Sequence, residues 1–201
     1  MDVDGYTMWV VGGSLLIVAP QITDDQRQRA LASLAAAQNA ADDSMGSRFE
    51  GQRCWARAYR KALGEHGWGV IHSCQSVESA ERRSVLAPLQ PLLLWLSAMH
   101  PHQADVLERC VAALNPRQDG LRQLSRRTLQ ASQDGARLVV ELGLLLPGPA
   151  LSLCSIALET ARCPDPEWLL TTFPGPLLHG DIHFQGLMLE PALGSATHTL
   201  H

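Results

Sequence analysis

Three apolar runs follow Gly135, and they constrain the fold more than any other feature of the sequence. Each run has the length of a strand, and Pro-Gly or Pro-Asp-Pro punctuation separates one from the next. Apolar side chains alternate from Leu138 to Leu146, which is the period of a strand. Cys154 and Leu158 share one face of the second run, and a Pro-Gly-Pro link between these two runs is typical of a hairpin. The region after Gly135 therefore predicts an antiparallel sheet.

The earlier part of the chain shows helical patterns. Thr23 and Gln26 have the spacing of a capping box, and an alanine-rich segment follows them up to the loop around Gly46. Trp55 and Tyr59 recur at helical spacing in a second segment, and further helical segments run from Pro91 to Asn115. We expect residues 23–130 to be mainly helical. Helices followed by strands predict an α+β fold, with a helical N-terminal half packed on a C-terminal antiparallel sheet.

Two further segments read as strands, and no linker divides the chain. The apolar N-terminal run, interrupted by Gly12-Gly13, predicts a buried strand or a hairpin. The segment 68–77 alternates enough to predict a short strand. We therefore expect one α+β domain over residues 1–201.

Composition excludes several classes of function. Hydrophobic residues make up 46% of the chain and the net charge is −4, so a globular protein without a nucleic-acid footprint is expected. The five cysteines form no CxxC pair, which is typical of buried thiols in a reducing compartment. The N-terminal run has no basic flank and is shorter than the roughly 20 residues of a membrane span. These observations predict a soluble cytoplasmic protein with no membrane span.

The sequence PGPLLHGDIHFQGLMLEP, near the C-terminus, contains a kinase-like motif. His179, Gly180, Asp181 and His183 resemble the HGDLH catalytic loop of the aminoglycoside and choline kinase-like phosphotransferases. The resemblance implies that Asp181 would orient an acceptor hydroxyl and that an asparagine five positions later would bind magnesium. Gly186 occupies that position here, and no aspartate follows Asp181. Phosphoryl transfer depends on metal ligands and phosphate clamps. A degenerate phosphotransferase is therefore a remote alternative.

A strand explains the same motif without catalysis. In an extended chain His179, Asp181 and His183 project to one face, while Ile182 and Phe184 project to the other. Two imidazoles and a carboxylate are suitable ligands for zinc or iron. Further ligands would be needed, and the candidates are His72, His100 and His102. The motif therefore predicts an amphipathic strand and, as an alternative, a metal site at His179, Asp181 and His183.

A fainter likeness covers the whole chain. MWVVGGSLLIV near the start, then WARAYRKALGEHGWGV, then a late strand containing His-Gly, is similar to a group of small uncharacterised bacterial α+β proteins. The likeness implies only that a fold of helices followed by a sheet is shared among such proteins.

Two classes of function follow from these patterns. Without an intact catalytic set, the apolar strands and aromatic helices predict a non-enzymatic binding or assembly protein, without a cofactor. Val139 and Leu145 are apolar opposite the Leu138–Leu146 set, so the sheet needs cover on both sides, and one helical layer covers only one. We therefore expect a homodimer or larger, and a protein partner as a further possibility. The alternative is a metal-dependent enzyme that uses the His/Asp/His strand face.

Overall fold

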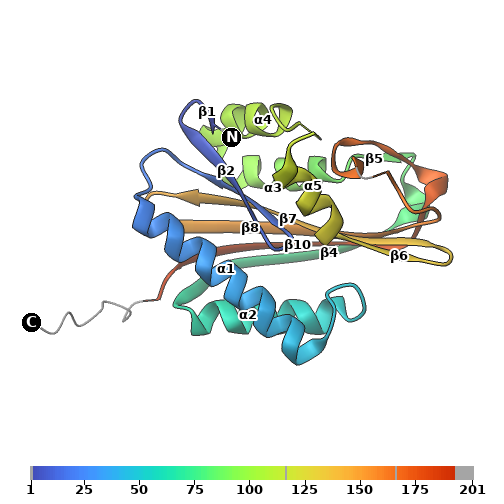
Figure 1. Ribbon diagram of the computed structural model, residues 1–201, viewed down its shortest axis with the longest axis horizontal. Coiled ribbons are helices and arrows are strands. Elements are labelled where there is room, and N and C mark those ends of the chain that lie inside the picture. Colours follow the sequence, from blue (N-terminus) through green and yellow to red (C-terminus); the bar gives the residue numbers. More distant parts are fainter. Residues whose placement is uncertain (1, 116, 166, 193–201) are drawn as a thin grey trace, which may run out of the picture.

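The central sheet lies between two layers of helices (Figure 1), in a computed structural model that describes residues 2–115, 117–165 and 167–192. The α-helices are α1 (Asp24–Met45), α2 (Gln52–Glu65), α3 (Leu89–Met99), α4 (Ala104–Ala112) and α5 (Asp119–Arg127). The strands are β1 (Asp2–Val3), β2 (Tyr6–Val11), β3 (Ser14–Val18), β4 (Trp68–Ser79), β5 (Val85–Leu86), β6 (Leu129–Ser132), β7 (Gly135–Leu146), β8 (Ala150–Thr160), β9 (Phe173–Pro174) and β10 (Leu178–Pro191). Short 3₁₀ turns are η1 (Ala80–Arg82), η2 (Pro101–Gln103), η3 (Trp168–Leu170) and η4 (Gly175–Leu177). The α+β prediction is confirmed.

The order of the main sheet is β1-β2-β3-β7-β8-β10-β4, with β6 beside β7. The three runs after Gly135 form its centre as consecutive antiparallel neighbours, as their alternation predicts. The N-terminal run forms the β2–β3 hairpin, which pairs with β7 through the only parallel contact of the described strands. The segment 68–77 forms a longer strand than expected, which continues to Ser79. Strands from the N-terminal half thus extend the C-terminal sheet on both sides.

Each face of the sheet is covered by helices of the same chain. Leu138, Val140 and Leu142 of β7 pack with buried residues of α3, α4 and α5. On the opposite face, Leu145 and Leu153 pack with α1 and α2. The single helical layer that we expected from the sequence is therefore wrong, because α1 and α2 supply a second layer that covers the other face of the sheet. Self-association needs a different structural basis.

Helix ends follow the local sequence signals. Thr23 accepts a hydrogen bond from the Gln26 backbone N–H, and the Gln26 side chain accepts one from the Thr23 N–H, which completes the predicted capping box. α1 ends at Gly46, whose φ of 76° favours glycine. Pro91 lies in the first turn of α3, where a missing N–H is tolerated.

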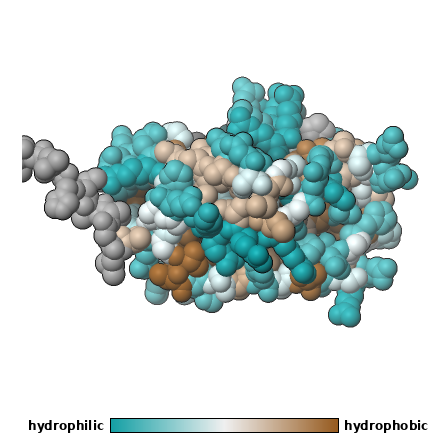
Figure 2. All heavy atoms as spheres, turned by 90° about the horizontal axis from the view of Figure 1, so that it is seen from below, coloured by the Kyte–Doolittle hydropathy of each residue, from teal (hydrophilic) through white to brown (hydrophobic). Residues whose placement is uncertain are grey.

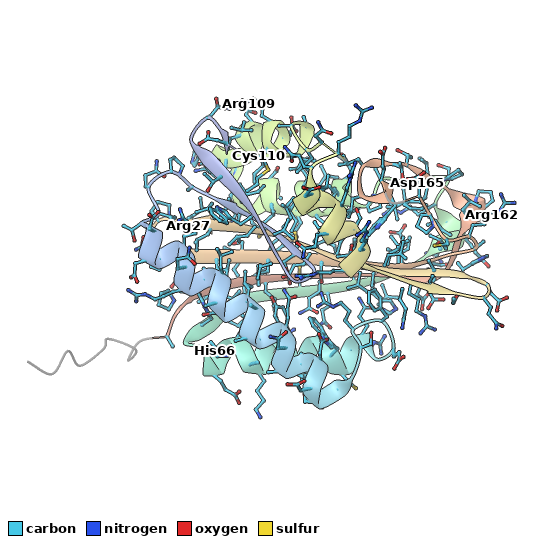
Figure 3. The ribbon with its side chains drawn as sticks, in the orientation of Figure 1. Arg27, His66, Arg109, Cys110, Arg162 and Asp165 are labelled. Carbon is cyan, nitrogen blue, oxygen red and sulfur yellow. The ribbon has the colours of Figure 1, made fainter. Side chains whose placement is uncertain are left out.

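Two arginines labelled in Figure 3 join β2 and the turn before it to helices on opposite sides of the sheet. The guanidinium of Arg27 in α1 lies 4.6 Å from the centre of the Trp9 ring. Arg109 of α4 binds the Asp4 carboxylate at 2.7 Å. Among the described residues, no helix combines the length and the apolar character needed to span a membrane.

Candidate functional site

Strand β4 forms one edge of the central sheet. Its inner side pairs with β10 along its full length, from Trp68 beside Pro191 to Ser79 beside Asp181. Its outer side has no neighbouring strand in the described part of the chain. Alternate residues of β4 therefore turn their backbone N–H and C=O groups outward, where another strand can pair with them.

Exposed apolar side chains gather on this edge. Val70, Ile71 and Val77 are 40%, 56% and 49% exposed, and the other large hydrophobic residues that the structure shows as exposed are scattered over α1, α3, β5 and η3. Figure 2 views the molecule from the α1–α2 side, where hydrophilic residues cover most of the surface and strongly hydrophobic areas are few. The apolar character of β4 is thus a local feature of the edge.

Edge strands of monomeric proteins usually carry lysine, proline or inward-pointing charges that prevent pairing with another chain. β4 contains no lysine, arginine or proline. Its one acidic residue, Glu78, lies near the end of the strand and is paired with Arg83 at 2.5 Å. The remaining irregularity is a bulge, which sets Val70 and Ile71 against Leu189 of β10. β4 therefore has little protection against strand addition.

The HGDIH residues lie on β10, as the strand interpretation predicts, but they do not all line one hollow. Asp181 and His183 line a groove of about 490 Å³ beneath the start of α2. His179 lines a neighbouring hollow, and the ion pair between Arg137 and Glu159, which measures 2.9 Å, borders both. Gly180, at a φ of 59°, accompanies a shift of register against β8 between His179 and His183.

No three His, Cys, Asp or Glu side chains within the described ranges gather closely enough to hold a metal ion. The histidines that sequence offered as further ligands lie elsewhere: His72 is on β4, and His100 contacts the Ser152 hydroxyl at 2.8 Å. His102 lies in η2. Metal binding at His179, Asp181 and His183 stays a prediction.

Gly186 stands where the phosphotransferase motif has asparagine, and the fold explains why a side chain is absent there. A Cβ at this position would lie 2.5 Å from two ring carbons of Trp95 and 2.8 Å from the sulfur of Cys74. Position 186 thus faces the packed interior beneath α3, and not a nucleotide or a metal ion. An asparagine could enter only if Trp95 moved.

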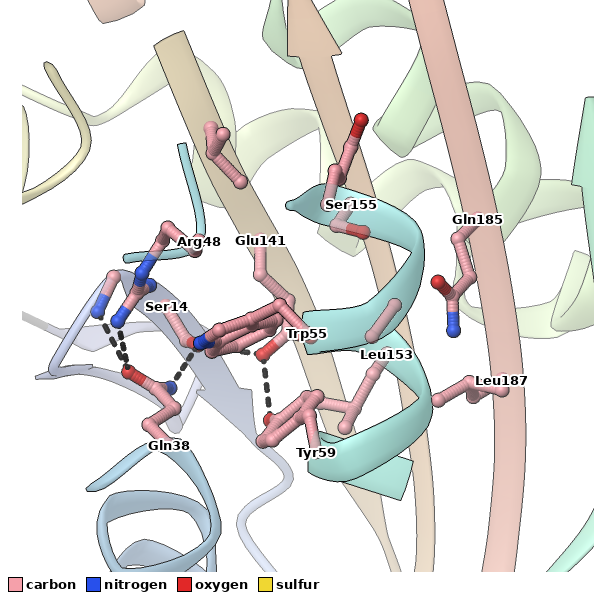
Figure 4. A pocket seen from close by; sticks show the side chains of 14 residues that line it. Ser14, Gln38, Arg48, Trp55, Tyr59, Glu141, Leu153, Ser155, Gln185 and Leu187 are labelled. Atoms are coloured by element: carbon pink, nitrogen blue, oxygen red, sulfur yellow. Dashed lines mark hydrogen bonds between the residues drawn. The ribbon is translucent and has the colours of Figure 1, made fainter. Parts of the chain in front are cut away.

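A polar cluster is enclosed between the sheet and the α1–α2 layer (Figure 4). Ser14 Oγ and the Tyr59 hydroxyl both donate to Glu141 Oε1, at 2.5 and 3.0 Å. Gln38 Nε2 donates to Ser14 Oγ at 2.8 Å, and Gln38 Oε1 accepts from the Gly13 N–H at 3.0 Å. The cluster therefore ties the β2–β3 turn, both helices and β7 together.

Burial is the largest influence on the acid–base chemistry of this cluster. It raises the pKa of Glu141, while hydrogen bonds from Ser14 and Tyr59 act in the opposite direction. Burial, reinforced by the charge of Glu141, raises the pKa of Tyr59 well above its ordinary value, so the phenol stays neutral and donates. The partners of Ser14 are a carboxyl group and an amide, and not the imidazole that activates a serine nucleophile.

The space beside Glu141 is too small for a substrate. The cavity measures about 30 Å³, which has room for about one or two water molecules. The cluster therefore serves to hold the layers together. The sequence carries one local signal of this cluster, because Glu141 is the only acid within the apolar run of β7, but its partners Ser14 and Tyr59 lie far away in the chain.

Comparisons with known proteins give no family. No protein-family profile matches the chain, and no curated protein matches it. One similar solved structure is the activated Cyt2Ba monomer from Bacillus thuringiensis subsp. israelensis, at 12% identity and a TM-score of 0.47, with 90% of this chain and 98% of that chain covered. Another is a delta-endotoxin, at 10% identity and a TM-score of 0.42, with coverage of 98% and 90%. At these values neither likeness carries an argument about function.

Proposed function

We propose that the chain is a non-enzymatic assembly protein, and that copies of it join through the open edge of β4. The observation that carries the proposal is the long unpaired side of this strand, with Val70, Ile71 and Val77 exposed along it. Strand addition satisfies the outward N–H and C=O groups and removes apolar surface from water in one step.

The chemistry of the other hollows supports binding rather than catalysis. The groove beneath α2 mixes basic and acidic side chains, among them Arg53, Arg137 and Asp181. Its thiol, Cys54, is exposed and forms no hydrogen bond with a base in the described part of the chain. The enclosed Glu141 cluster is filled by its own partners. A surface that joins copies of the chain needs neither the groove nor the Glu141 cluster, because backbone hydrogen bonds and apolar contacts supply the affinity.

Light scattering at micromolar concentration tests the proposal. We expect wild type at about twice the chain mass of 21.9 kDa, and Val77→Lys at the mass of one chain, because a lysine on the edge opposes strand pairing. Val85→Lys is the matched control: Val85 is 50% exposed, as Val77 is 49% exposed, but it lies on β5 in the small separate sheet. We expect this control to keep the wild-type mass.

Two results would contradict the proposal. One is wild type at the single-chain mass throughout the micromolar range. The other is a Val77→Lys variant that associates as wild type does, since that would place the contact elsewhere.

A further inference from the structure

We propose that two copies pair their β4 strands antiparallel about a twofold axis at Cys74, so that Cys74 of each copy lies opposite Cys74 of the other. The inference rests on the proposed assembly function, and it adds the partner, the direction and the register. A twofold contact of this kind is self-complementary, because the same strand supplies both sides.

The first support is the position of Cys74 within the strand. β4 and β10 pair from Trp68–Pro191 to Ser79–Asp181, and Cys74–Gly186 is the middle pair of this ladder once the bulge is counted. A twofold axis at Cys74 therefore pairs the whole of β4 with its counterpart. Any other centre leaves an end of each strand unpaired.

The second support is the match of apolar side chains. With Cys74 at the centre, Val77 of one copy lies opposite the bulge that carries Val70 and Ile71 in the other copy. The twofold axis repeats this contact between Val77 and the bulge, so that it forms once on each side of the axis. A centre at Gln75 would instead place Val77 opposite Ser73. β-Branched residues that face each other across strands stabilise a sheet, whereas an apolar side chain opposite serine gains less.

The third support is the absence of an obstacle. Glu78, the one charged side chain of β4, lies opposite the Gly69 end of the second strand in this register, so no like charges meet directly. Ser73, Gln75 and Ser76, around the centre, are exposed, and Cys74 itself is half-buried. No large side chain of β4 therefore stands in the way at the centre of the strand, where the two copies would first meet.

Cys74 makes the register measurable. Directly opposite residues in an antiparallel pair have Cα atoms about 4.5–5.5 Å apart, which lies inside the range of about 4.4–6.8 Å that a disulfide spans. Diagonal neighbours are about 7–8 Å apart and fall outside it. Diamide, a mild oxidant, takes two electrons and two protons from a pair of thiols and leaves a disulfide, so it joins cysteines that lie opposite each other.

The experiment starts from the Cys54→Ser/Cys163→Ser variant. This background removes the two exposed thiols, while Cys110 and Cys154 are buried. We expect diamide to convert this protein to a covalent dimer that dithiothreitol reverses, and addition of Cys74→Ser to abolish the dimer. Adding Gln75→Cys to the Cys74→Ser protein should not restore it, because residue 75 lies diagonal to its counterpart. Adding Ser73→Cys as well should restore it, because positions 73 and 75 face each other.

Light scattering of the same samples before oxidation separates the two proposals. A noncovalent dimer in which Cys74 fails to cross-link, or in which Gln75→Cys alone cross-links, overturns the register and leaves the assembly function intact. A single-chain mass overturns both. A dimer that follows the expected cross-linking pattern supports both.

Discussion

Gly186 of β10 packs against Trp95 of α3 so closely that a single added carbon would lie 2.5 Å from the indole ring. This contact shows why the HGDIH motif is not followed by the metal-binding asparagine of a phosphotransferase loop. The motif belongs to a strand with one polar side and one side packed against α3. Gly186 lies on the packed side. The resemblance to a phosphotransferase loop therefore stops where the metal ligand would have to be.

The Gly186 contact predicts a large cost for any side chain at this position. Gly186→Ala should lower the free energy of unfolding by about 1–3 kcal/mol, the usual range for overpacking a core. Gly69→Ala on β4 is the control, because a Cβ there would meet its nearest atom at 3.7 Å, an ordinary contact. Urea unfolding measures both. Equal stabilities for the two variants would show that Trp95 does not pack as described.

Asp181 should have no nucleotide-dependent role. Its side chain is exposed, and within the described ranges it belongs to no group of three side chains that could hold a metal ion. Thermal-shift titration with Mg-ATP should give no saturable stabilisation of wild type. Asp181→Asn should change the free energy of unfolding by less than about 0.5 kcal/mol, as expected at an exposed position. Stabilisation by Mg-ATP that disappears in Asp181→Asn would revive the phosphotransferase alternative.

Metal analysis decides the other enzymatic alternative. Because His179 lines a different hollow from Asp181 and His183, we expect no near-stoichiometric zinc or iron in protein purified from metal-supplemented cells. The metal content of a His179→Ala/His183→Ala variant should equal that of wild type. About one metal ion per chain, lost in the double variant, would favour the metal-dependent enzyme.

The Glu141 carboxyl predicts a pH dependence of stability. Its pKa in the folded protein is raised, so its contribution to stability is complete below the ordinary value of 4.5 and is lost as the pH rises through the raised pKa. Unfolding free energies measured across this window should fall for wild type and fall less for Glu141→Gln. Glu81→Gln, at an exposed position, serves as the control. Parallel profiles for wild type and Glu141→Gln would exclude this role for Glu141.

Sequence patterns within a few residues predicted most helices and strands correctly. They could not predict which distant helices and strands pack or pair with one another. The capping box at Thr23 and the alternation from Leu138 to Leu146 depend on neighbours within a few residues, and the structure confirms both. The pairing of Ile17 with Leu144 joins segments far apart in the chain, and neither run alone specifies its partner. The same applies to the Glu141 cluster and to the edge position of β4. An edge strand and an inner strand can have the same local pattern.

Hydrogen exchange along β4 tests most directly whether copies join at this edge. Exchange of amide hydrogens, followed by mass spectrometry, is compared at a dilution where wild type is one chain and at a concentration where it is associated. The assembly account predicts that peptides covering Trp68–Ser79 become protected on association, while peptides from α1 do not change. Protection confined to other segments, or identical exchange of β4 at both concentrations, would contradict it.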